Sequence, residues 1–313
     1  MKIIDWLKQG DPVIADHTDR DLLDMPVRVR EEGLLRRYLD LYDPACSGWG
    51  AGLYSPKWIS DHYTLIELKD MGIRRDHPAY RASVENLLRC MWYKGRPKIG
   101  RKREYDMCMA AMLLDLCVYG GIVDPRMEEI VDYILAHPMA DGGWNCSWDS
   151  PKRPKKSSLH TTISVLEAFR DYRRFGYSYR LDEIAAVIPP AEEFIFRKRF
   201  FRSVRTGEII HSEMLEFHYP PRWKYDAFRG LDYFRSVDHP YDPRMDETMD
   251  ILRTRIRRGY ILRGSPISGL IRMPLETTKG GRFNTLCAMR ILRRYDPGFY
   301  HELCSVDFAS LDA

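Results

Sequence analysis

The 313-residue sequence contains no apolar run that approaches the length of a membrane span, so we expect no transmembrane segment. No apolar stretch follows the opening MKIIDWLKQGDP, and we expect no signal peptide. The seven cysteines are odd in number and scattered, which argues against a disulfide framework and favours a reducing, cytoplasmic compartment. The net charge is only +4, with Lys and Arg in local clusters, which favours local anion sites over a surface that coats nucleic acid.

Signatures of several common enzyme classes are also missing. The sequence has no Walker A loop, no G-x-G-x-x-G after a strand, no nucleophile elbow, no H-E-x-x-H and no paired C-x-x-C. Almost nothing alternates apolar and polar residues with period two, which argues against a β-rich fold. No low-complexity segment or linker divides the chain. We therefore expect one domain over residues 1–313, built from helices.

The sequence does contain a repeat. DPRMEEIVDYIL from Asp124 and DPRMDETMDIL from Asp242 are near copies that start 118 positions apart. In each, the Asp can cap a helix N-terminus and the Pro occupies the first helical position, where its missing N–H costs nothing. DHPAYRASVENLL from Asp76 and DPGFYHELC from Asp296 are looser copies. We interpret all four as the starts of one set of helices.

A second set of helices alternates with the first. Aligning five segments by their apolar positions places five polar residues in register: His62, Asp106, His160, Asp226 and Asn284. Apolar residues follow each of them at helical spacing. Repeated helical hairpins stack as an open solenoid or close into a ring. We expect the ring, which is an all-α fold, an α/α toroid of about five to six helical hairpins around a central cavity.

In such a ring the inner helices begin at one rim, so the five registered residues would form a belt near the mouth of the cavity. We take His62, Asp106, His160 and Asp226 as catalytic candidates. The alternative is that these residues are helix caps facing solvent, which applies most to Asp226 and Asn284. Histidine is a poor N-cap, so the capping alternative is weaker for the two histidines.

The DGGW turn at residues 141–144, followed by SSLHTTISVLEAF, resembles the repeat of squalene–hopene cyclases and of protein prenyltransferase β subunits. Both are α/α toroids, and the resemblance extends from about residue 45 to residue 295 as degenerate repeats. The opening segment is similar to that of bacterial proteins described as squalene-cyclase-like or prenyltransferase-like. Cyclases that start by protonation need a D-x-D-D string, and the nearest string here is DETMD at Asp246. The resemblance therefore implies an isoprenoid substrate without proton-initiated cyclisation.

The prenyltransferase branch also implies a metal. Those enzymes hold one zinc with an Asp and a Cys two positions apart at the start of one inner helix, and a His at the start of the next. Asp106 and Cys108 match the D-x-C, and His160 follows Cys108 by 52 positions, about one hairpin. The implied ligands are a carboxylate, a thiolate and an imidazole, which zinc accepts while keeping a fourth position open. Inserted residues before Asp106, and Met109 in place of an aromatic residue, depart from the family pattern.

Two other interpretations of the same residues stay open. Cys108 begins the run CMAAMLLDLC, and cysteine is a common core residue, so it can simply be buried. A rival metal set consists of Cys146, Asp149 and His160.

Two basic loops, KGRPKIGRKRE and PKRPKKSS, precede the two candidate zinc helices. In a toroid both loops lead to the same rim, where helix N-termini add positive potential that suits phosphate or diphosphate. We expect a substrate and anion site near His62, made of Arg101, Arg103, Lys155, Lys156, Tyr105 and Trp144. The alternative is that these cations only solvate long loops.

Five tryptophans lie in or beside the loops of this rim: Trp49, Trp58, Trp144, Trp148 and Trp223. In related toroids such residues tie hairpins together by stacking, so we expect a structural role for them. Some could instead line an apolar cavity, where aromatic faces stabilise a carbocation.

The leading functional hypothesis is a prenyltransferase-like or terpene cyclase-like enzyme, with zinc as cofactor, that acts on an isoprenoid diphosphate or a similar apolar substrate with an anionic head. The first alternative is a hydrolase or lyase on a carbohydrate that uses the His and Asp belt as acid and base. The second is a binding protein without catalysis. The cavity lining separates them: apolar walls indicate an isoprenoid, a carboxylate pair indicates a sugar, and a filled centre indicates a binding protein.

Overall fold

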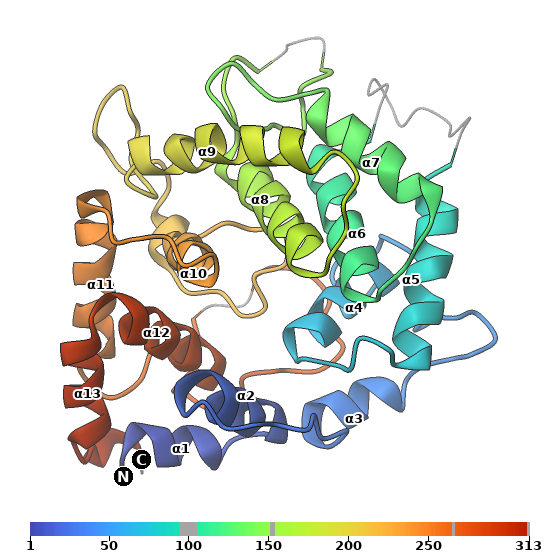
Figure 1. The fold of residues 1–313 in the computed structure, drawn as a ribbon. Coiled ribbons are helices and arrows are strands. Elements are labelled where there is room, and N and C mark those ends of the chain that lie inside the picture. The colour runs from blue at the N-terminus through green and yellow to red at the C-terminus, as the bar shows by residue number, and fades with distance from the viewer. Residues whose placement is uncertain (94–104, 151–153, 265–266, 312–313) are drawn as a thin grey trace.

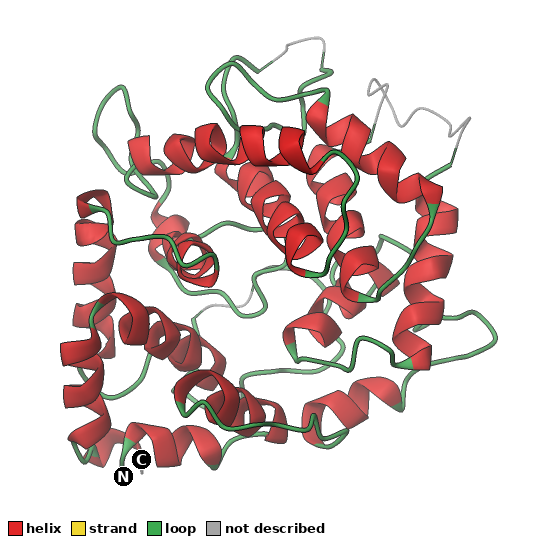
Figure 2. Cartoon of the chain, viewed as in Figure 1, coloured by secondary structure: helices red, strands yellow, loops and turns green. Residues whose placement is uncertain are grey.

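The structure, a computed structural model, describes residues 1–93, 105–150, 154–264 and 267–311. Over these residues the chain is helical, and its extended pairings are three isolated β-bridges (Figure 2). The prediction of an all-α fold is therefore confirmed. No helix in these ranges is long and apolar enough to cross a membrane.

Six helices, called here the inner helices, surround the centre of the molecule in Figure 1. They are α2 (Pro12–Leu22), α4 (Asp61–Asp70), α6 (Met107–Tyr119), α8 (Leu159–Arg174), α10 (Ala227–Ser236) and α12 (Arg282–Tyr295). Contacts join α4 to α6, α6 to α8, α8 to α10, α10 to α12 and α12 to α2. The first inner helix of the chain thus packs against the last.

Seven further helices, the outer helices, lie outside this set (Figure 1). They are α1 (Ile3–Lys8), α3 (Gly33–Leu39), α5 (Pro78–Met91), α7 (Pro125–Leu135), α9 (Leu181–Arg197), α11 (Asp246–Ile256) and α13 (Pro297–Ser305). Three short 3₁₀ turns complete the described elements: η1 (Ser212–Leu215), η2 (Pro243–Met245) and η3 (Ala309–Leu311). Helix α1 contacts α13, so the two ends of the chain also meet.

The repeated Asp-Pro motif starts outer helices, as the sequence predicts. At α7, η2 and α13 the side chains of Asp124, Asp242 and Asp296 accept backbone N–H bonds of 2.8–3.2 Å. The second copy begins with the 3₁₀ turn η2, which leads directly into α11. Helix α5 has His77 rather than Asp76 at its N-cap position, and no side chain caps it there. Asp11 caps the inner helix α2 in the same way. Asp11 and Pro12 are therefore a further copy of the Asp-Pro motif, which was not predicted from the sequence.

All five polar residues aligned in the sequence lie at the starts of inner helices. His62, His160 and Asn284 lie in the first turns of α4, α8 and α12, respectively. Asp106 and Asp226 occupy the N-cap positions of α6 and α10. The five polar residues therefore share the N-terminal ends of five inner helices but do not occupy one equivalent helical position.

The DGGW turn packs tightly between two helices. Gly142 has a φ of +103°, and a Cβ there would lie 2.4 Å from the backbone oxygen of Pro190 in α9. A Cβ at Gly143 would lie 2.4 Å from Oγ1 of Thr162 in α8. Both positions therefore require glycine, and the turn fixes the start of α8 beneath α9.

Candidate functional site

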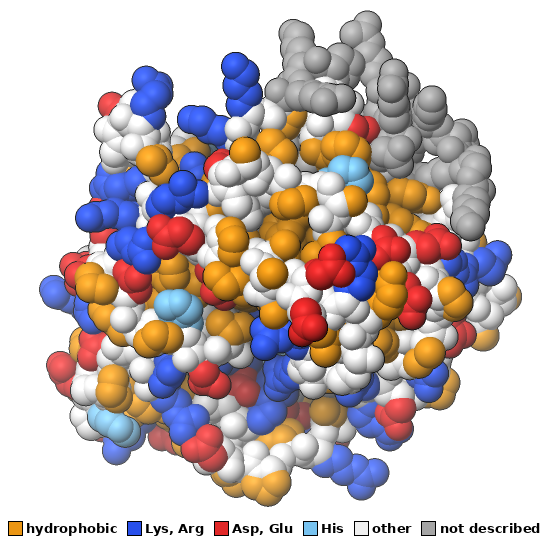
Figure 3. Space-filling model, turned by 45° about the horizontal axis from the view of Figure 1, so that its top comes forward, with side chains coloured by type: hydrophobic (Ala, Val, Ile, Leu, Met, Phe, Trp, Pro, Cys, Tyr) orange, Lys and Arg blue, Asp and Glu red, His pale blue; other side chains and the backbone are white. Residues whose placement is uncertain are grey.

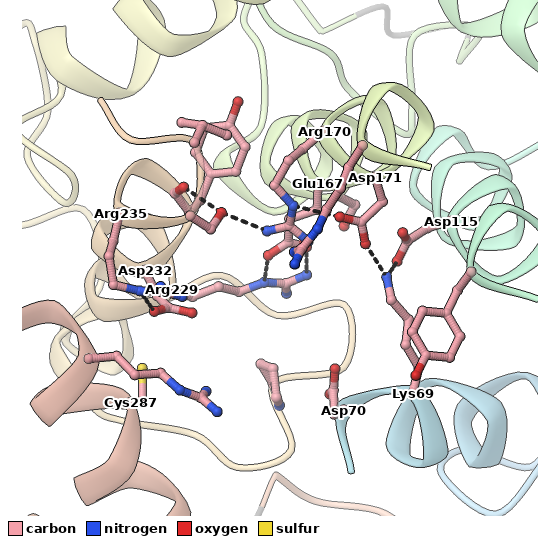
Figure 4. Close-up of a pocket in the computed structure, with 18 of the residues that line it drawn as sticks. Lys69, Asp70, Asp115, Glu167, Arg170, Asp171, Arg229, Asp232, Arg235 and Cys287 are labelled. Carbon is pink, nitrogen blue, oxygen red and sulfur yellow. Dashed lines mark hydrogen bonds and ion pairs between the residues drawn. The ribbon is translucent and has the colours of Figure 1, made fainter. Parts of the chain in front are cut away.

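A cavity of about 1560 Å³ lies among the inner helices. It is bounded mainly by the C-terminal halves of α4, α6 and α8, by α10, by parts of α2 and α12, and by residues between 217 and 222. Figure 4 shows charged side chains gathered in this space from several helices. They include Lys69 and Asp70 from α4, Asp115 from α6, Arg170 and Asp171 from α8, and Arg229 from α10.

Lys69 lies at the centre of a network that joins three inner helices. Its Nζ donates to Oδ2 of Asp171 at 2.8 Å and also to the carboxylate of Asp115. Arg170 Nε donates to the other oxygen of Asp171 at 2.7 Å. Two carboxylates, one ammonium and one guanidinium therefore meet where α4, α6 and α8 approach one another (Figure 4).

A second pair extends the network to α10. Arg229 donates to Glu167 of α8 through Nε at 3.0 Å and through Nη2 at 2.5 Å, which is the two-point geometry that holds a carboxylate firmly. Arg170 also donates from Nη1 to Oγ of Ser236 at 2.9 Å. Helices α4, α6, α8 and α10 are thus linked through charged side chains on the cavity wall.

The two carboxyl groups on Lys69 differ in proton affinity. Burial favours the neutral form of Asp171, but Lys69 and Arg170 outweigh it and hold its pKa well below the usual range. Burial dominates at Asp115, where Lys69 offsets it only in part, and the pKa rises to about 7. Burial would lower the pKa of Lys69, but the two carboxylates outweigh it and raise that pKa, so the ammonium stays charged.

Asp70 adds a second carboxyl group of high pKa. Burial raises its pKa to about 7, opposed by Lys69 and Arg229 and assisted by the negative charge of Glu167. Its side chain accepts no hydrogen bond and forms no ion pair with any residue that the structure describes. Because its pKa is near neutrality, Asp70 can both take up and release a proton at physiological pH.

Asp226 is a helix cap that also lines the cavity. Its Oδ1 accepts from the backbone N–H groups of Phe228 and Arg229 at 3.0 and 2.8 Å, so Asp226 caps α10, but it is buried and does not face solvent as the capping alternative expected. Its Oδ2 lies 3.6 Å from Nδ1 of His218, another lining residue. Asn284 lines the cavity as well, and its Nδ2 donates to the backbone oxygen of Leu262 at 3.0 Å.

The two candidate histidines do not line the cavity. His62 is fully buried beside Tyr54 and Tyr63, and neither ring nitrogen has a hydrogen-bond partner among the described residues. Burial lowers its pKa to about 3. His160 accepts through Nδ1 from the backbone N–H of Tyr225 at 2.8 Å, and burial, assisted by Arg229, lowers its pKa to about 4. Of the predicted belt, Asp226 and Asn284 therefore line the cavity. The other three residues, His62, Asp106 and His160, lie at the N-terminal ends of α4, α6 and α8, away from the cavity.

Asp106 and Cys108 also lie at the start of α6, away from the cavity. Cys108 is half-buried beside Cys146, and its backbone N–H donates to the Cys146 sulfur at 3.1 Å. Among the described residues, no three His, Cys, Asp or Glu side chains come together as a possible metal-ligand group. Neither Asp106, Cys108 and His160 nor the rival set of Cys146, Asp149 and His160 therefore forms such a group in this structure. The zinc site stays a prediction.

Of the expected anion-site residues, Arg101 and Arg103 lie outside the described residues. Lys155 and Lys156 are exposed. Tyr105 stacks on Trp92 with the ring centroids 3.9 Å apart, and its hydroxyl donates to the backbone oxygen of Tyr93.

Trp144 is completely buried, and its indole N–H donates to the backbone oxygen of Ile134 at 2.9 Å. No surface of its ring is left for a substrate, so the structural role expected for the tryptophans fits this residue better than substrate binding does.

The charged residues at the C-terminal halves of the inner helices were not predicted from the sequence. A signal for them exists, because Asp115 is the one charged residue in the otherwise apolar segment 107–119. An isolated charge in a buried helix is costly unless it is paired or functional. On the outside, Lys and Arg side chains lie among Asp and Glu side chains over the face shown in Figure 3.

No protein-family model, curated protein or solved structure matches the chain. The residues of the site are therefore the basis on which a function can be inferred.

Proposed function

We propose that the chain is a closed α/α toroid whose lumen is the charged cavity. Three observations support this arrangement: inner and outer helices alternate along the chain, α2 packs against α12, and α1 contacts α13. The resemblance of the DGGW repeat to cyclases and prenyltransferases points the same way.

For the activity, we propose an enzyme that transfers protons on a hydrophilic substrate, the class of a hydrolase or lyase on a carbohydrate. The observation that carries this proposal is the unpaired Asp70, with a pKa of about 7, in a cavity that also contains Asp115 with a pKa of about 7. General acid–base catalysis works best with groups that titrate near the operating pH. Asp70 would serve as base and Asp115, in its protonated form, as acid.

The lining favours a polar substrate over an isoprenoid. A prenyl chain in this space would displace water from Lys69, Arg229 and other charged groups without replacing the lost hydrogen bonds, which is costly. The volume exceeds the roughly 300–1,000 Å³ of typical small-molecule pockets, which suits an oligomer. Tyr219 and Phe283, which stack at 3.8 Å on the cavity wall, offer an apolar surface for a sugar ring.

The experiment is a screen of neutral and acidic oligosaccharides with two readouts. New reducing ends indicate hydrolysis, and ultraviolet absorbance of an unsaturated product indicates elimination. Asp70→Asn should abolish the activity, whereas Asp106→Asn, which changes the predicted belt outside the cavity, should leave most of it. The opposite pattern, or turnover of farnesyl diphosphate that stops on chelation, would overturn the proposal in favour of the belt and its zinc.

A further inference from the structure

Two thiols meet at the end of α6 that lies away from the cavity. The sulfur of Cys146, in the loop before α8, accepts hydrogen bonds from the backbone N–H of Cys108 at 3.1 Å and from Oγ1 of Thr161 at 3.3 Å. Both cysteines are half-buried, and both are free thiols. Neither lines the cavity, so this pair is independent of the proposed catalytic residues.

The surroundings divide the roles between the two thiols. A thiolate is stabilised by hydrogen-bond donors and by the first turn of a helix, and the Cys146 sulfur has both. The backbone N–H of Cys108 contacts the Cys146 sulfur directly, so the Cys108 thiol belongs to the residue placed beside a mixed disulfide formed there. We propose that Cys146 and Cys108 are a reversible redox pair, with Cys146 as nucleophile and Cys108 as the resolving thiol, oxidised by a small-molecule disulfide of the glutathione type.

The reaction consists of two thiol–disulfide exchanges. The Cys146 thiolate attacks glutathione disulfide, an S–S bond forms between Cys146 and one glutathione, and the other glutathione leaves as a thiolate that takes a proton from water. Cys108 then loses its proton to solvent and attacks the Cys146 sulfur, which releases the second glutathione. Two protein thiols are oxidised to one disulfide, and one glutathione disulfide is reduced to two thiols.

The disulfide would connect positions 38 residues apart and fasten the start of α6 to the loop that leads into α8. A cross-link of this kind restricts the unfolded chain, so the oxidised protein should melt at a higher temperature than the reduced protein. Dithiothreitol should return the melting temperature to its starting value.

The test is peptide mapping after incubation with glutathione disulfide and alkylation of the remaining thiols. Trypsin cleaves after Arg126, which separates Cys108 from Cys146 in the sequence, so the disulfide is detected as two linked peptides that lack two hydrogen atoms. We expect these linked peptides in the intact chain. Cys108→Ser should accumulate glutathione on Cys146, whereas Cys146→Ser should leave Cys108 unmodified.

Cys46→Ser is the matched control, because Cys46 is the exposed cysteine among those described and the linked peptides should form without it. Two results would overturn the proposal. One is that Cys108 and Cys146 both remain open to alkylation while Cys46 carries glutathione. The other is one equivalent of bound zinc that Cys108→Ser removes, because Cys108 would then be a metal ligand.

Discussion

Asp115 and Asp171 reach the same ammonium group, that of Lys69, from two neighbouring inner helices. Asp171 is also paired with Arg170, whereas Oδ1 of Asp115 has no hydrogen-bond partner among the described residues. The positive charge is therefore shared unequally, and the two carboxyl groups differ in pKa although they bind one cation. An arrangement of this kind keeps one carboxylate ionised and leaves the other able to hold a proton, which acid–base chemistry requires.

Removing the shared cation should strongly destabilise the fold. Lys69→Met leaves the carboxylates of Asp115 and Asp171 buried near each other without their ammonium, and breaking a buried pair in this way costs about 3–5 kcal/mol. Urea denaturation at mildly alkaline pH measures the loss. Adding Asp115→Asn to Lys69→Met should recover part of it by removing one charge. If the unfolding free energy of Lys69→Met alone stays within about 1 kcal/mol of the parent, water in the cavity screens these charges.

The stability of the protein should fall as pH rises toward about 7, and Asp70 should contribute to this fall together with Asp115, whose pKa is also about 7. The folded pKa of Asp70, about 7, lies above the ordinary value of 3.8, so between these pH values the folded state holds a proton that the unfolded chain releases. The contribution of Asp70 to the free energy of unfolding is therefore fully present below pH 3.8. It is lost as the pH rises to about 7, by at most about 1.4 kcal/mol per pH unit.

Asp70→Asn removes the contribution of Asp70 and leaves that of Asp115 in place. The stability of the variant relative to the parent should therefore increase as pH rises from about 4 to about 7 and stay constant above that range. Denaturation curves at several pH values measure the difference. Asp182→Asn, which changes an exposed carboxylate on the cavity wall, is the control and should retain the parental slope. An equal slope in Asp70→Asn and the parent would mean that Asp70 titrates in its ordinary range.

Local patterns in the sequence predict the helices but not the site. The Asp-Pro starts and the five registered residues depend on contacts within a few positions, such as the bond of Asp124 to the next-but-one backbone N–H. The Lys69 network joins residues 46 and 102 positions apart, and no local pattern encodes such a pairing. The belt was expected to border the cavity, yet His62 is fully buried, and the open space lies toward the other ends of α4, α6 and α8. Which end of these helices is filled by side chains and which is left open depends on how the whole chain packs.

Trp144 should behave as a core residue. Trp144→Ala removes a fully buried ring and the indole bond to Ile134, which should cost about 3–5 kcal/mol of unfolding free energy. Trp144→Phe keeps an aromatic ring and should cost less. The exposed Lys156→Ala, twelve positions away, is the control and should change stability by less than about 0.5 kcal/mol. If Trp144→Ala instead unfolds with about the same free energy as the parent, the ring is not needed for the core, and the expectation that it contacts a substrate would be supported.

Asp226 combines two roles that substitutions can separate. Its Oδ1 caps α10 by accepting two backbone N–H bonds, and asparagine caps helices about as well as aspartate. Asp226→Asn should therefore stay within about 0.5 kcal/mol of the parent in thermal or urea unfolding, whereas Asp226→Ala should lose about 1–2 kcal/mol. Asp296→Ala removes the cap of the outer helix α13 together with the ion pair of Asp296 and Arg253, so it should lose at least as much as Asp226→Ala. The second role is the approach of Oδ2 to His218 at 3.6 Å on the cavity wall. If Asp226→Asn is as harmful as Asp226→Ala, the negative charge beside His218, rather than the cap, stabilises this part of the cavity wall.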